Sequence, residues 1–375
     1  MGELEGIDAD TAALLQRYGF DGKTFEGLRE RLRRGDAGAA GNRLTGTVVP
    51  PEPDDIVTLP PPGSPERERL AAVGRALIAD GGGASVILAG GMATRFGGVV
   101  KAGVEAAAGL TFLELKLADA RAAAAAAGGR VPVYLMASFA TEPEVRRLGE
   151  AAASETTPVE TFAQAISLRL DGEGDLFRDP EGRLSPYAPG HGDLPWALRH
   201  SGVLARFRNA GGRVIVMSNV DNVTATLDPA IVGLHVEGGR PMSAEMAPKL
   251  PGDKGGAPAR VDGTLQIVEA FRFPEAFDQD RIPVFNTNTL LFDADALDRD
   301  FPLSWFAVRK KVKGAEALQF ERLVGELSAF LPATYVRVER EGADARFQPV
   351  KDPAELARRQ EEILVALRSR GILAD

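Results

Sequence analysis

Short apolar runs alternate along the middle of the chain with longer segments in which apolar residues recur at helical spacing. The runs that predict strands are SVILA (85–89), VPVYLM (131–136) and RVIVMS (213–218), and residues 111–127 and 193–208 predict helices. Buried strands that alternate with amphipathic helices are typical of βαβ units, in which helices cover both faces of a parallel sheet. The pattern therefore predicts an α/β fold with a mostly parallel central sheet.

The pattern differs on both sides of this alternating region. Residues 1 to about 35 alternate apolar and charged positions at helical spacing, and the stretch from about 43 to 64 is rich in proline, which predicts an extended linker. After residue 240 the spacing becomes strand-like. Strands are expected around 241–247, 263–272, 284–292 and YVRVER (335–340), with a closing helix from about 352.

The composition narrows the chemistry that this chain can perform. Its 375 residues include no cysteine and 3 histidines, which excludes thiol nucleophiles and Cys-ligated metal sites and argues against a His-rich metal site. Acidic residues outnumber basic ones by 53 to 44, a balance that argues against nucleic-acid binding. No run approaches the roughly 20 apolar residues of a membrane span, and no secretory signal is visible. We therefore expect a cytoplasmic protein that binds neither nucleic acid nor membrane.

The strand at 85–89 runs directly into a glycine-dense loop, GGMATRFGG (90–98), which is followed by Lys101. Paired glycines after a strand let the backbone approach a phosphate or a base closely, and successive N–H groups can form an anion-binding concavity. The spacing matches neither a P-loop nor a G-x-G-x-x-G turn. A tight turn into a helix is the plainer alternative.

Two further loops carry polar side chains beside predicted elements. In PGHGD (189–193), Asp193 is expected to be a helix N-cap, and the two glycines around His191 are expected to expose its ring to a ligand. In SNVDN (218–222), Asp221 lies just past a buried strand, where a carboxylate is well placed to hold Mg²⁺ beside a triphosphate. An Asx-turn is the alternative for any one of these polar residues.

The strand-like region adds two amides and a carboxylate. Asn286 and Asn288 are two positions apart in an apolar run, so they are expected on the same face of a strand. Buried amides cost free energy unless they are paired, so either the fold or a hydroxyl-rich ligand is expected to bind them. Glu269 lies on a preceding predicted strand, and Lys351 places a cation near the C-terminus, where a surface lysine is the default interpretation.

Taken in order, these segments resemble the uridylyltransferase family of UTP–glucose-1-phosphate and UDP-N-acetylhexosamine pyrophosphorylases. The resemblance covers roughly residues 84–352, and its PGHGD, DKGG, FNTN and FQPVK motifs are closer to the glucose-1-phosphate branch. It implies a glycosyltransferase-A-like (Rossmann-like) nucleotidyltransferase core. It rests on the glycine loop with Lys101, MASFAT (136–141), PGHGD, SNVDN, DKGG (253–256), Glu269, FNTN (285–288) and FQPVK (347–351).

The resemblance also implies an activity and a set of site residues. The expected reaction forms a UDP-sugar and pyrophosphate from UTP and a sugar-1-phosphate, with glucose-1-phosphate as the expected sugar and Mg²⁺ as the cofactor. Nucleotide binding is implied for Leu88, Ala89, Gly90, Gly91, Gln164 and Gly190. Sugar binding is implied for His191, Asn219, Gly256, Glu269, Asn286 and Asn288. Catalytic roles are implied for Lys351, Lys101 and Asp221, with Asp221 as the metal ligand.

On this basis the chain is expected to have three parts. These are a helical N-terminal segment with the proline-rich linker (1–80), a nucleotidyltransferase domain (81–335) and a short strand and helix that carry Lys351 (336–375). Because no C-terminal β-helix follows, we expect a monomer or a small homo-oligomer.

The sequence departs from the family at Ala93, where glycine is favoured, and at Val100, where proline is usual. These departures are expected to alter the glycine loop and to displace Lys101. Two alternatives therefore stay open. One is the same chemistry on galactose- or N-acetylglucosamine-1-phosphate, and the other is a UDP-sugar-binding protein that has lost catalysis.

Overall fold

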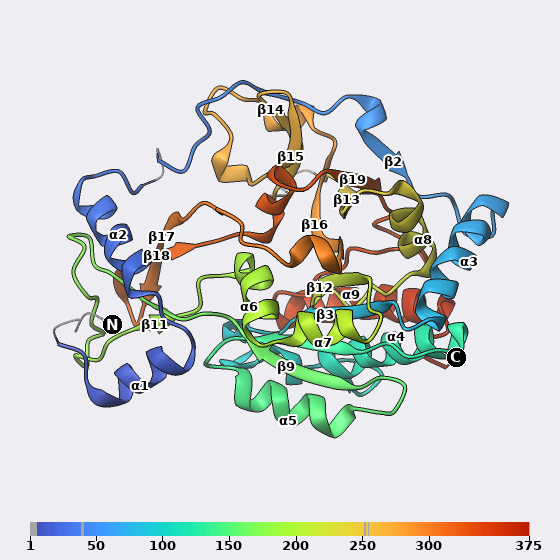
Figure 1. The fold of residues 1–375 in the computed structure, drawn as a ribbon, viewed down its shortest axis with the longest axis horizontal. Helices are drawn as coiled ribbons and strands as arrows, with labels where there is room; N and C mark the ends of the chain where they lie inside the picture. The colour runs from blue at the N-terminus through green and yellow to red at the C-terminus, as the bar shows by residue number, and fades with distance from the viewer. Residues whose placement is uncertain (1–5, 39–40, 251–252, 254, 375) are drawn as a thin grey trace.

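A mixed eight-stranded sheet forms the centre of the computed structural model, which describes residues 6–38, 41–250, 253 and 255–374 (Figure 1). In spatial order its strands are β2 (Ile56–Thr58), β19 (Ala333–Arg337), β13 (Met242–Pro248), β16 (Val284–Asp293), β12 (Val214–Asn219), β3 (Gly83–Leu88), β8 (Val133–Ala137) and β9 (Val159–Ala163). Only β16 is antiparallel to its neighbours within this sheet of described residues. The mostly parallel α/β fold predicted from the sequence is confirmed.

Alternate side chains of the central strands enter two different apolar clusters. On β3, Val86 and Ile87 belong to opposite clusters, and on β12 Ile215 and Val216 divide in the same way. Burial on both faces explains why these strands read as almost continuous apolar runs. Five helices cover the cluster that contains Ile87: α3 (Pro65–Ala79), α4 (Phe112–Ala127), α5 (Glu142–Ala152), α8 (Pro229–Gly238) and α9 (Pro353–Ser369). The cluster that contains Val86 is covered by α6 (Leu194–His200) and α7 (Val203–Asn209).

The helix predicted over 111–127 is confirmed by α4. It begins with a capping box, in which the Thr111 hydroxyl accepts from Glu114 N and the Glu114 carboxylate accepts from Thr111 N. The helix predicted over 193–208 is two helices, α6 and α7. The chain breaks at Gly202, whose φ of 76° is incompatible with a continuous right-handed helix.

The proline-rich stretch is more than a linker, which corrects the sequence prediction. It contains two strands. Strand β1 (Val48–Val49) pairs with β14 (Ala257–Val261), and β2 forms one edge of the central sheet. The α3 helix that follows packs directly against α8, where a Cβ at Gly74 would lie 1.9 Å from the Pro229 carbonyl oxygen. The second half of residues 1–80 therefore belongs to the same folded unit as the sheet. At the other end, β19 crosses the predicted boundary at 335/336.

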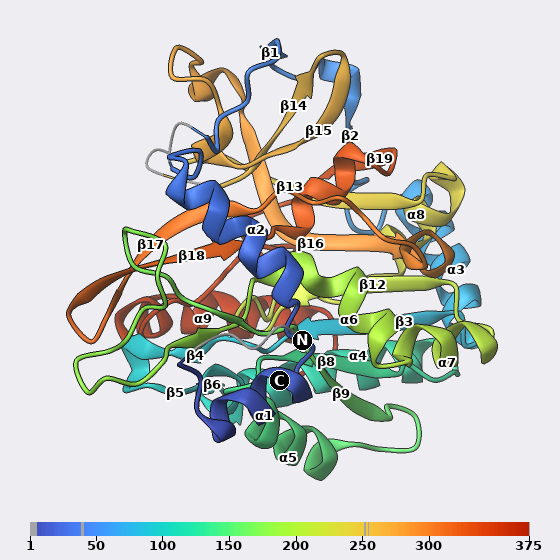
Figure 2. The ribbon, with the colours of Figure 1, turned by 60° about the vertical axis from the view of Figure 1, so that its left-hand side comes forward.

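The first two helices lie beside a hairpin that the hydrophobic pattern did not predict. The helices are α1 (Ala9–Arg17) and α2 (Gly22–Arg33), and the hairpin is β17 (Phe306–Val312) with β18 (Ala315–Glu321) (Figure 2). A third apolar cluster joins them: Leu15, Phe25 and Leu28 from the helices with Leu318 and Phe320 from β18. The amphipathic N-terminal segment therefore buries its apolar face on a part of the chain that lies about 300 residues later.

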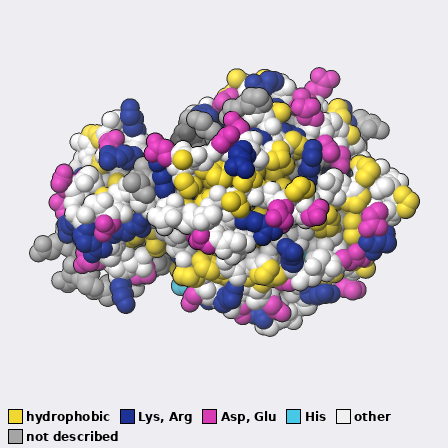
Figure 3. Space-filling model, turned by 90° about the horizontal axis from the view of Figure 1, so that it is seen from above, with side chains coloured by type: hydrophobic (Ala, Val, Ile, Leu, Met, Phe, Trp, Pro, Cys, Tyr) yellow, Lys and Arg dark blue, Asp and Glu magenta, His cyan; other side chains and the backbone are white. Residues whose placement is uncertain are grey.

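The surface agrees with the charge balance of the sequence. On the face shown in Figure 3, basic side chains are interspersed with acidic and apolar ones. Binding to nucleic acid by charge alone needs basic side chains gathered on one face or along one groove. Among the described residues, no helix is long and apolar enough to cross a membrane.

Candidate active site

A cavity of about 560 Å³ opens where β3, β8 and β12 end, at one edge of the parallel half of the sheet. In open α/β sheets this is the edge where ligands bind, because the loops after neighbouring parallel strands meet there. The sequence-predicted residues that line the cavity are Leu88, Gly90, Gly91, Lys101, Gln164, Gly190, His191, Asn219 and Asp221. These loops are far apart in the sequence, and the sheet brings them together.

The glycine loop is fixed to its neighbours through backbone atoms. The carbonyl of Leu88 accepts from Val220 N at 3.2 Å, and the carbonyl of Gly90 accepts from the Ser138 hydroxyl at 2.9 Å. A Cβ at Gly90 would lie 3.2 Å from Ser138 N, so a side chain there would press on the next loop. Among the residues predicted to bind the nucleotide, Ala89 is buried, and its N–H donates to Met136 O.

Lys101 lies in the cavity, with Val100 before it. Its ammonium group pairs with the Asp221 carboxylate at 2.5 Å, and both side chains are less than a fifth exposed. Lys101 therefore reaches the carboxylate that follows β12, and the displacement expected from Val100 stays a prediction. The side chain of Ala93 lies outside the described residues.

Asp221 is suited to a magnesium ion that a substrate also helps to bind. Among the described residues no group of three or more His, Asp or Glu side chains could hold a metal on its own. Mg²⁺ is usually bound through one or two carboxylates together with substrate phosphates and water. A single carboxylate beside a cavity, with the Lys101 cation next to it, fits that pattern, and Asp221 would hold the ion.

The C-terminal segment passes directly behind this carboxylate. Val350 N donates to the Asp221 carbonyl at 3.2 Å, and Asn222 fixes the same segment by accepting from Gln348 N and donating to Arg346 O. Asn222 therefore has a structural role. Lys351 follows immediately, but its side chain is exposed and does not line the cavity.

A long-range ion pair joins the glycine loop to the residue after Lys351. Arg95 lies 3.9 Å from the carboxylate of Asp352. Lys351 therefore lies between Val350, which bonds to the backbone of Asp221, and Asp352, which pairs with the glycine loop.

The glycines of PGHGD serve packing, which corrects the expectation that they expose His191. A Cβ at Gly192 would lie 2.5 Å from the backbone carbon of Arg322, and Gly190 has a φ of 101° with its Cβ position 2.8 Å from Arg322 O. Only glycine allows this contact between two backbones. The His191 ring is only partly exposed and is held by Val324 N, which donates to its Nδ1 at 3.0 Å.

The hydrogen bond from Val324 also fixes the tautomer of His191. Since Nδ1 accepts a hydrogen bond, the proton of the neutral ring is on Nε2, which makes the imidazole a hydrogen-bond donor at that atom. Burial lowers the pKa of His191 to about 4, against a smaller opposite effect of Glu321. The ring therefore offers a neutral N–H in the cavity.

Asp193 occupies the N-cap position of α6, as predicted, but its carboxylate makes no capping hydrogen bond. The carboxylate instead accepts from Ala165 N at 3.1 Å and forms an ion pair with Arg322. These contacts tie the PGHGD loop to the residue that follows Gln164. Gln164 N donates to Ala137 O, so the Gln164 side chain stands at the end of β8, on the cavity wall.

The predicted sugar-binding amides form a connected row. The Asn288 side chain donates to Asn219 Oδ1 at 3.0 Å, and Asn288 N donates to Asn286 Oδ1 at 3.0 Å. This geometry needs a φ of 60° at Asn288, where the pairing of β16 with β13 shifts register. Both β16 amides are only half-buried, and the fold supplies some of their partners. The sequence analysis treated these two amides as buried, and the structure corrects this.

Gly256 and Glu269 continue this row away from Asn219. Asn286 N donates to the Gly256 carbonyl at 2.7 Å, and a Cβ at Gly256 would lie 3.0 Å from the Glu269 carboxylate. Burial raises the pKa of Glu269, and Arg272 opposes this effect. Lys254 of the DKGG segment lies outside the described residues.

Several cavity residues were missed by the sequence analysis. Arg169 donates through Nε to Gln319 at 2.8 Å and through Nη1 to Ser185 at 2.9 Å, and Arg169 and Gln319 both line the cavity. Phe139, in the MASFAT segment, lines it as well and packs its ring against Tyr18 of the N-terminal region. No local spacing signals these contacts, because each joins distant parts of the chain.

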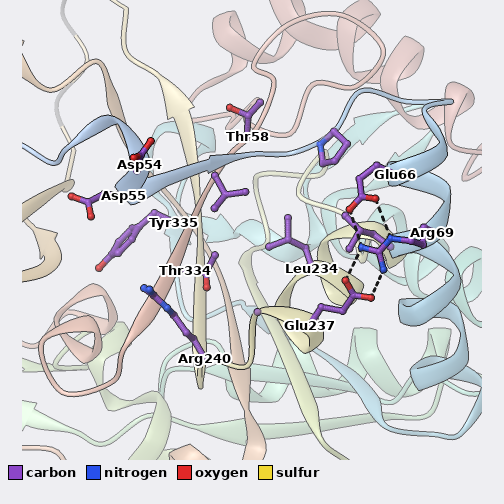
Figure 4. Close-up of a pocket in the computed structure, with 14 residues that line it drawn as sticks. Asp54, Asp55, Thr58, Glu66, Arg69, Leu234, Glu237, Arg240, Thr334 and Tyr335 are labelled. Atoms are coloured by element: carbon purple, nitrogen blue, oxygen red, sulfur yellow. Dashed lines mark hydrogen bonds and ion pairs between the residues drawn. The ribbon is translucent and has the colours of Figure 1, made fainter.

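A second hollow, of about 420 Å³, lies at the β2 edge of the sheet (Figure 4). It contains an ion-pair group in which Arg69 bonds to both Glu66 and Glu237. None of the described site residues predicted from the sequence lines it. We favour the cavity where β3, β8 and β12 end as the functional site, because strand ends, an ion pair and glycine loops meet there.

Comparison with known proteins identifies the family of the chain. The family of UTP–glucose-1-phosphate uridylyltransferases matches residues 83–369, a range that contains the cavity and every predicted site residue. The chain belongs to this family. Relatives in it include the UTP–glucose-1-phosphate uridylyltransferases of Musa acuminata (29% identical over 289 residues) and Solanum tuberosum (31% over 290 residues). The matches cover 72% of this chain and 60% and 59% of those relatives, so the chain spans about three fifths of their length.

Solved structures show the same uridylyltransferase fold. The UDP-N-acetylglucosamine pyrophosphorylase of Trypanosoma brucei aligns with a TM-score of 0.78 at 22% identity, covering 99% of this chain and 84% of that one. The UDP-glucose phosphorylase of the same organism aligns with a TM-score of 0.71 at 21% identity, covering 91% and 76%. Members named for two different sugars therefore share the fold.

Proposed function

We propose that the protein forms a UDP-sugar and pyrophosphate from UTP and a sugar-1-phosphate, with glucose-1-phosphate as the sugar and Mg²⁺ as the metal. The observation that carries the proposal is the Lys101–Asp221 ion pair in the cavity at the ends of β3 and β12. A cation for phosphate and a carboxylate for Mg²⁺ lie side by side there, next to a wall of glycine backbone. Membership of the family supports the reaction class.

In this reaction an oxygen of the sugar phosphate attacks the α-phosphorus of UTP in line, and the bond to pyrophosphate breaks. Positioning and charge neutralisation supply most of the catalysis of such a step. Mg²⁺, when bound, neutralises charge on the phosphate oxygens. Lys101 and Asp221 neutralise each other in the free protein. With substrates bound, Lys101 would contact the phosphates and Asp221 would hold the metal.

The other residues bind and orient the two substrates. Gln164 and the backbone at Gly190 bind the uracil edge, while the carbonyl and N–H groups of the glycine loop follow the nucleotide. His191 donates from Nε2 to the sugar phosphate, which a neutral ring with this tautomer is able to do. The row from Asn219 to Glu269 binds sugar hydroxyls. Lys351 reaches in from the mouth and neutralises charge at the α-phosphate.

The names of the curated relatives favour glucose-1-phosphate over other sugars. The shared fold of the N-acetylglucosamine enzyme keeps a different sugar as the second candidate. One added acetyl group needs space that a tight sugar pocket denies, so the two substrates are expected to differ clearly in kcat/KM.

The test is pyrophosphate release from UTP and Mg²⁺ with glucose-, galactose- and N-acetylglucosamine-1-phosphate as separate substrates. The expected result is release with all the components and the highest kcat/KM for glucose-1-phosphate. A higher value for another sugar would replace the proposed substrate. Tight binding of UDP-glucose without any exchange of labelled pyrophosphate would show a UDP-sugar-binding protein and overturn the proposed activity.

A further inference from the structure

Lys116 is a buried lysine on α4 that none of the proposed substrate contacts uses. Its side chain is 3% exposed, and its ammonium group donates to the Ser218 hydroxyl at 2.9 Å and to the Ala225 carbonyl at 2.7 Å. A buried ammonium group is costly unless it is well paired. Burial lowers the pKa of Lys116 to about 8. The position of this group therefore calls for an explanation beyond core packing.

The two acceptors of Lys116 lie on either side of Asp221. Ser218 is the second-last residue of strand β12, and Ala225 lies at the end of the loop that follows this strand. Lys116 thus bridges the beginning and the end of the loop that carries the proposed metal ligand. One turn further along α4, Asp119 accepts from Leu227 N at 2.8 Å and holds the same loop a little beyond Ala225.

The C-terminal segment also holds this loop. Arg346 is fully buried and forms an ion pair with the buried Glu245. Its guanidinium group also donates to both the hydroxyl oxygen and the carbonyl oxygen of Thr226. Val350 N donates to the Asp221 carbonyl. The loop is therefore held between α4 and the segment that leads to Lys351, and its hydrogen bonds to α4 come from side chains.

We propose that Lys116 is a positioning residue, which holds the loop 219–225 in one conformation and so fixes the Asp221 carboxylate for the metal. This inference rests on the proposed function. Lys116 touches neither substrate nor metal in this arrangement; it acts through Ser218 and Ala225. Partners that orient a metal ligand typically affect metal affinity or activity by about 10- to 100-fold.

The first experiment measures the loop itself, without substrate. Hydrogen exchange of peptides that span 219–225 is compared among the wild type, Lys116→Met and Arg121→Met. Arg121 is the matched control, because it lies on the same helix and donates to a backbone carbonyl, that of Ala152, away from the cavity. The expected result is faster exchange over 219–225 in Lys116→Met only. Equal exchange in the two variants would overturn the proposal.

The second experiment measures the rate against Mg²⁺ concentration. Lys116→Met is expected to lower kcat by about 10- to 100-fold and to raise the Mg²⁺ concentration for half-maximal rate, while Arg121→Met leaves both unchanged. In an Asp221→Asn background, Lys116→Met is expected to add little, because the group it positions is gone. A full additional loss in that background would contradict a role exercised through Asp221.

A milder variant covers the case in which Lys116→Met does not fold. Ser218→Ala removes one of the two acceptors and leaves the lysine in place, so it is expected to give the same changes at smaller size. An unchanged Mg²⁺ dependence in folded Ser218→Ala, with unchanged exchange over 219–225, would overturn the inference. If the wild type released no pyrophosphate with any sugar, the proposed function would fail, and the exchange measurement would still decide the role of Lys116.

Discussion

The two ends of the predicted site are built in different ways. At the proposed nucleotide end, glycine backbone and the charged pair Lys101–Asp221 lie beside the strand ends and line the cavity. At the proposed sugar end, neutral amides bond to each other in a row that begins at Asn219 on the cavity wall and continues to Asn288, which is not among the residues that line the cavity. A charged pair can be separated by a metal ion and phosphates that compete for its partners, whereas a row of neutral hydrogen bonds stays in place. We therefore expect the first end to respond to charge and the second to select by shape.

The largest expected effect of a single change is at the charged end. Asp221→Asn keeps the size of the side chain and removes its charge, so it is expected to lower kcat by about 10²- to 10³-fold. The KM for the sugar-1-phosphate is expected to stay close to the wild-type value. Steady-state pyrophosphate release measures both quantities.

The control for this variant is Asp54→Asn, an exposed aspartate beside the hollow at the β2 edge, which should leave activity unchanged. A thermal melt of both proteins checks the fold. Near wild-type activity in Asp221→Asn would remove this residue from the metal site and would break the contrast between the two ends.

A smaller effect is expected at the neutral end. Asn288→Gly removes the amide that bonds to Asn219, and glycine adopts the φ of 60° without strain. Loss of a neutral hydrogen bond, about 1 kcal/mol, is expected to raise the KM for the sugar-1-phosphate by roughly 5-fold while kcat changes less. Initial rates over a range of sugar-1-phosphate concentrations measure the change.

The matched variant Asn288→Ala separates the amide from the backbone. Alanine also removes the amide but must adopt a left-handed conformation, so it is expected to unfold at lower urea concentration than Asn288→Gly with a similar KM. A fall in kcat as large as that of Asp221→Asn would show that the two ends do not divide binding and catalysis in this way.

The last prediction concerns stability rather than activity, at His191, which lines the cavity. Its pKa falls from 6.5 to about 4 in the folded protein, so the unfolded chain binds a proton that the folded protein does not between these values. Its stabilising contribution is therefore complete above about pH 6.5 and is lost as the pH falls toward 4. Between pH 7 and 5 we expect the wild type to lose about 2 kcal/mol more unfolding free energy than His191→Gln.

Urea unfolding of both proteins at pH 7 and pH 5 measures this difference. Glutamine is the suitable replacement because its carbonyl can accept from Val324 N as the imidazole does, without titrating. An equal loss in the two proteins would mean that His191 keeps its ordinary pKa, and the ring would then be protonated at pH 5 and would count with the charged end of the cavity.

Local signals explain why much of the fold could be predicted. The strands β3, β8 and β12 are continuous apolar runs because both of their faces are buried, and α4 carries good helix formers and a capping box. The order of the motifs also placed Gly90, Lys101 and Asp221 at strand ends, where the cavity lies. The β17–β18 hairpin was missed although its pairing is local, with a two-residue turn at Lys313 and Gly314 that both adopt positive φ. What the sequence pattern did not indicate is that its apolar face packs against helices at the other end of the chain.

By itself, the sequence determined the fold class, the family motifs and the position of each motif next to a strand, since hydrophobic period and glycine placement are local properties. The tertiary structure decided which of these groups meet. Lys101 finds Asp221 120 residues away, Gly192 packs against Arg322, and Lys116 bonds on both sides of the Asp221 loop. These contacts depend on sheet order and on close approach of separate segments, and no spacing along the chain records them.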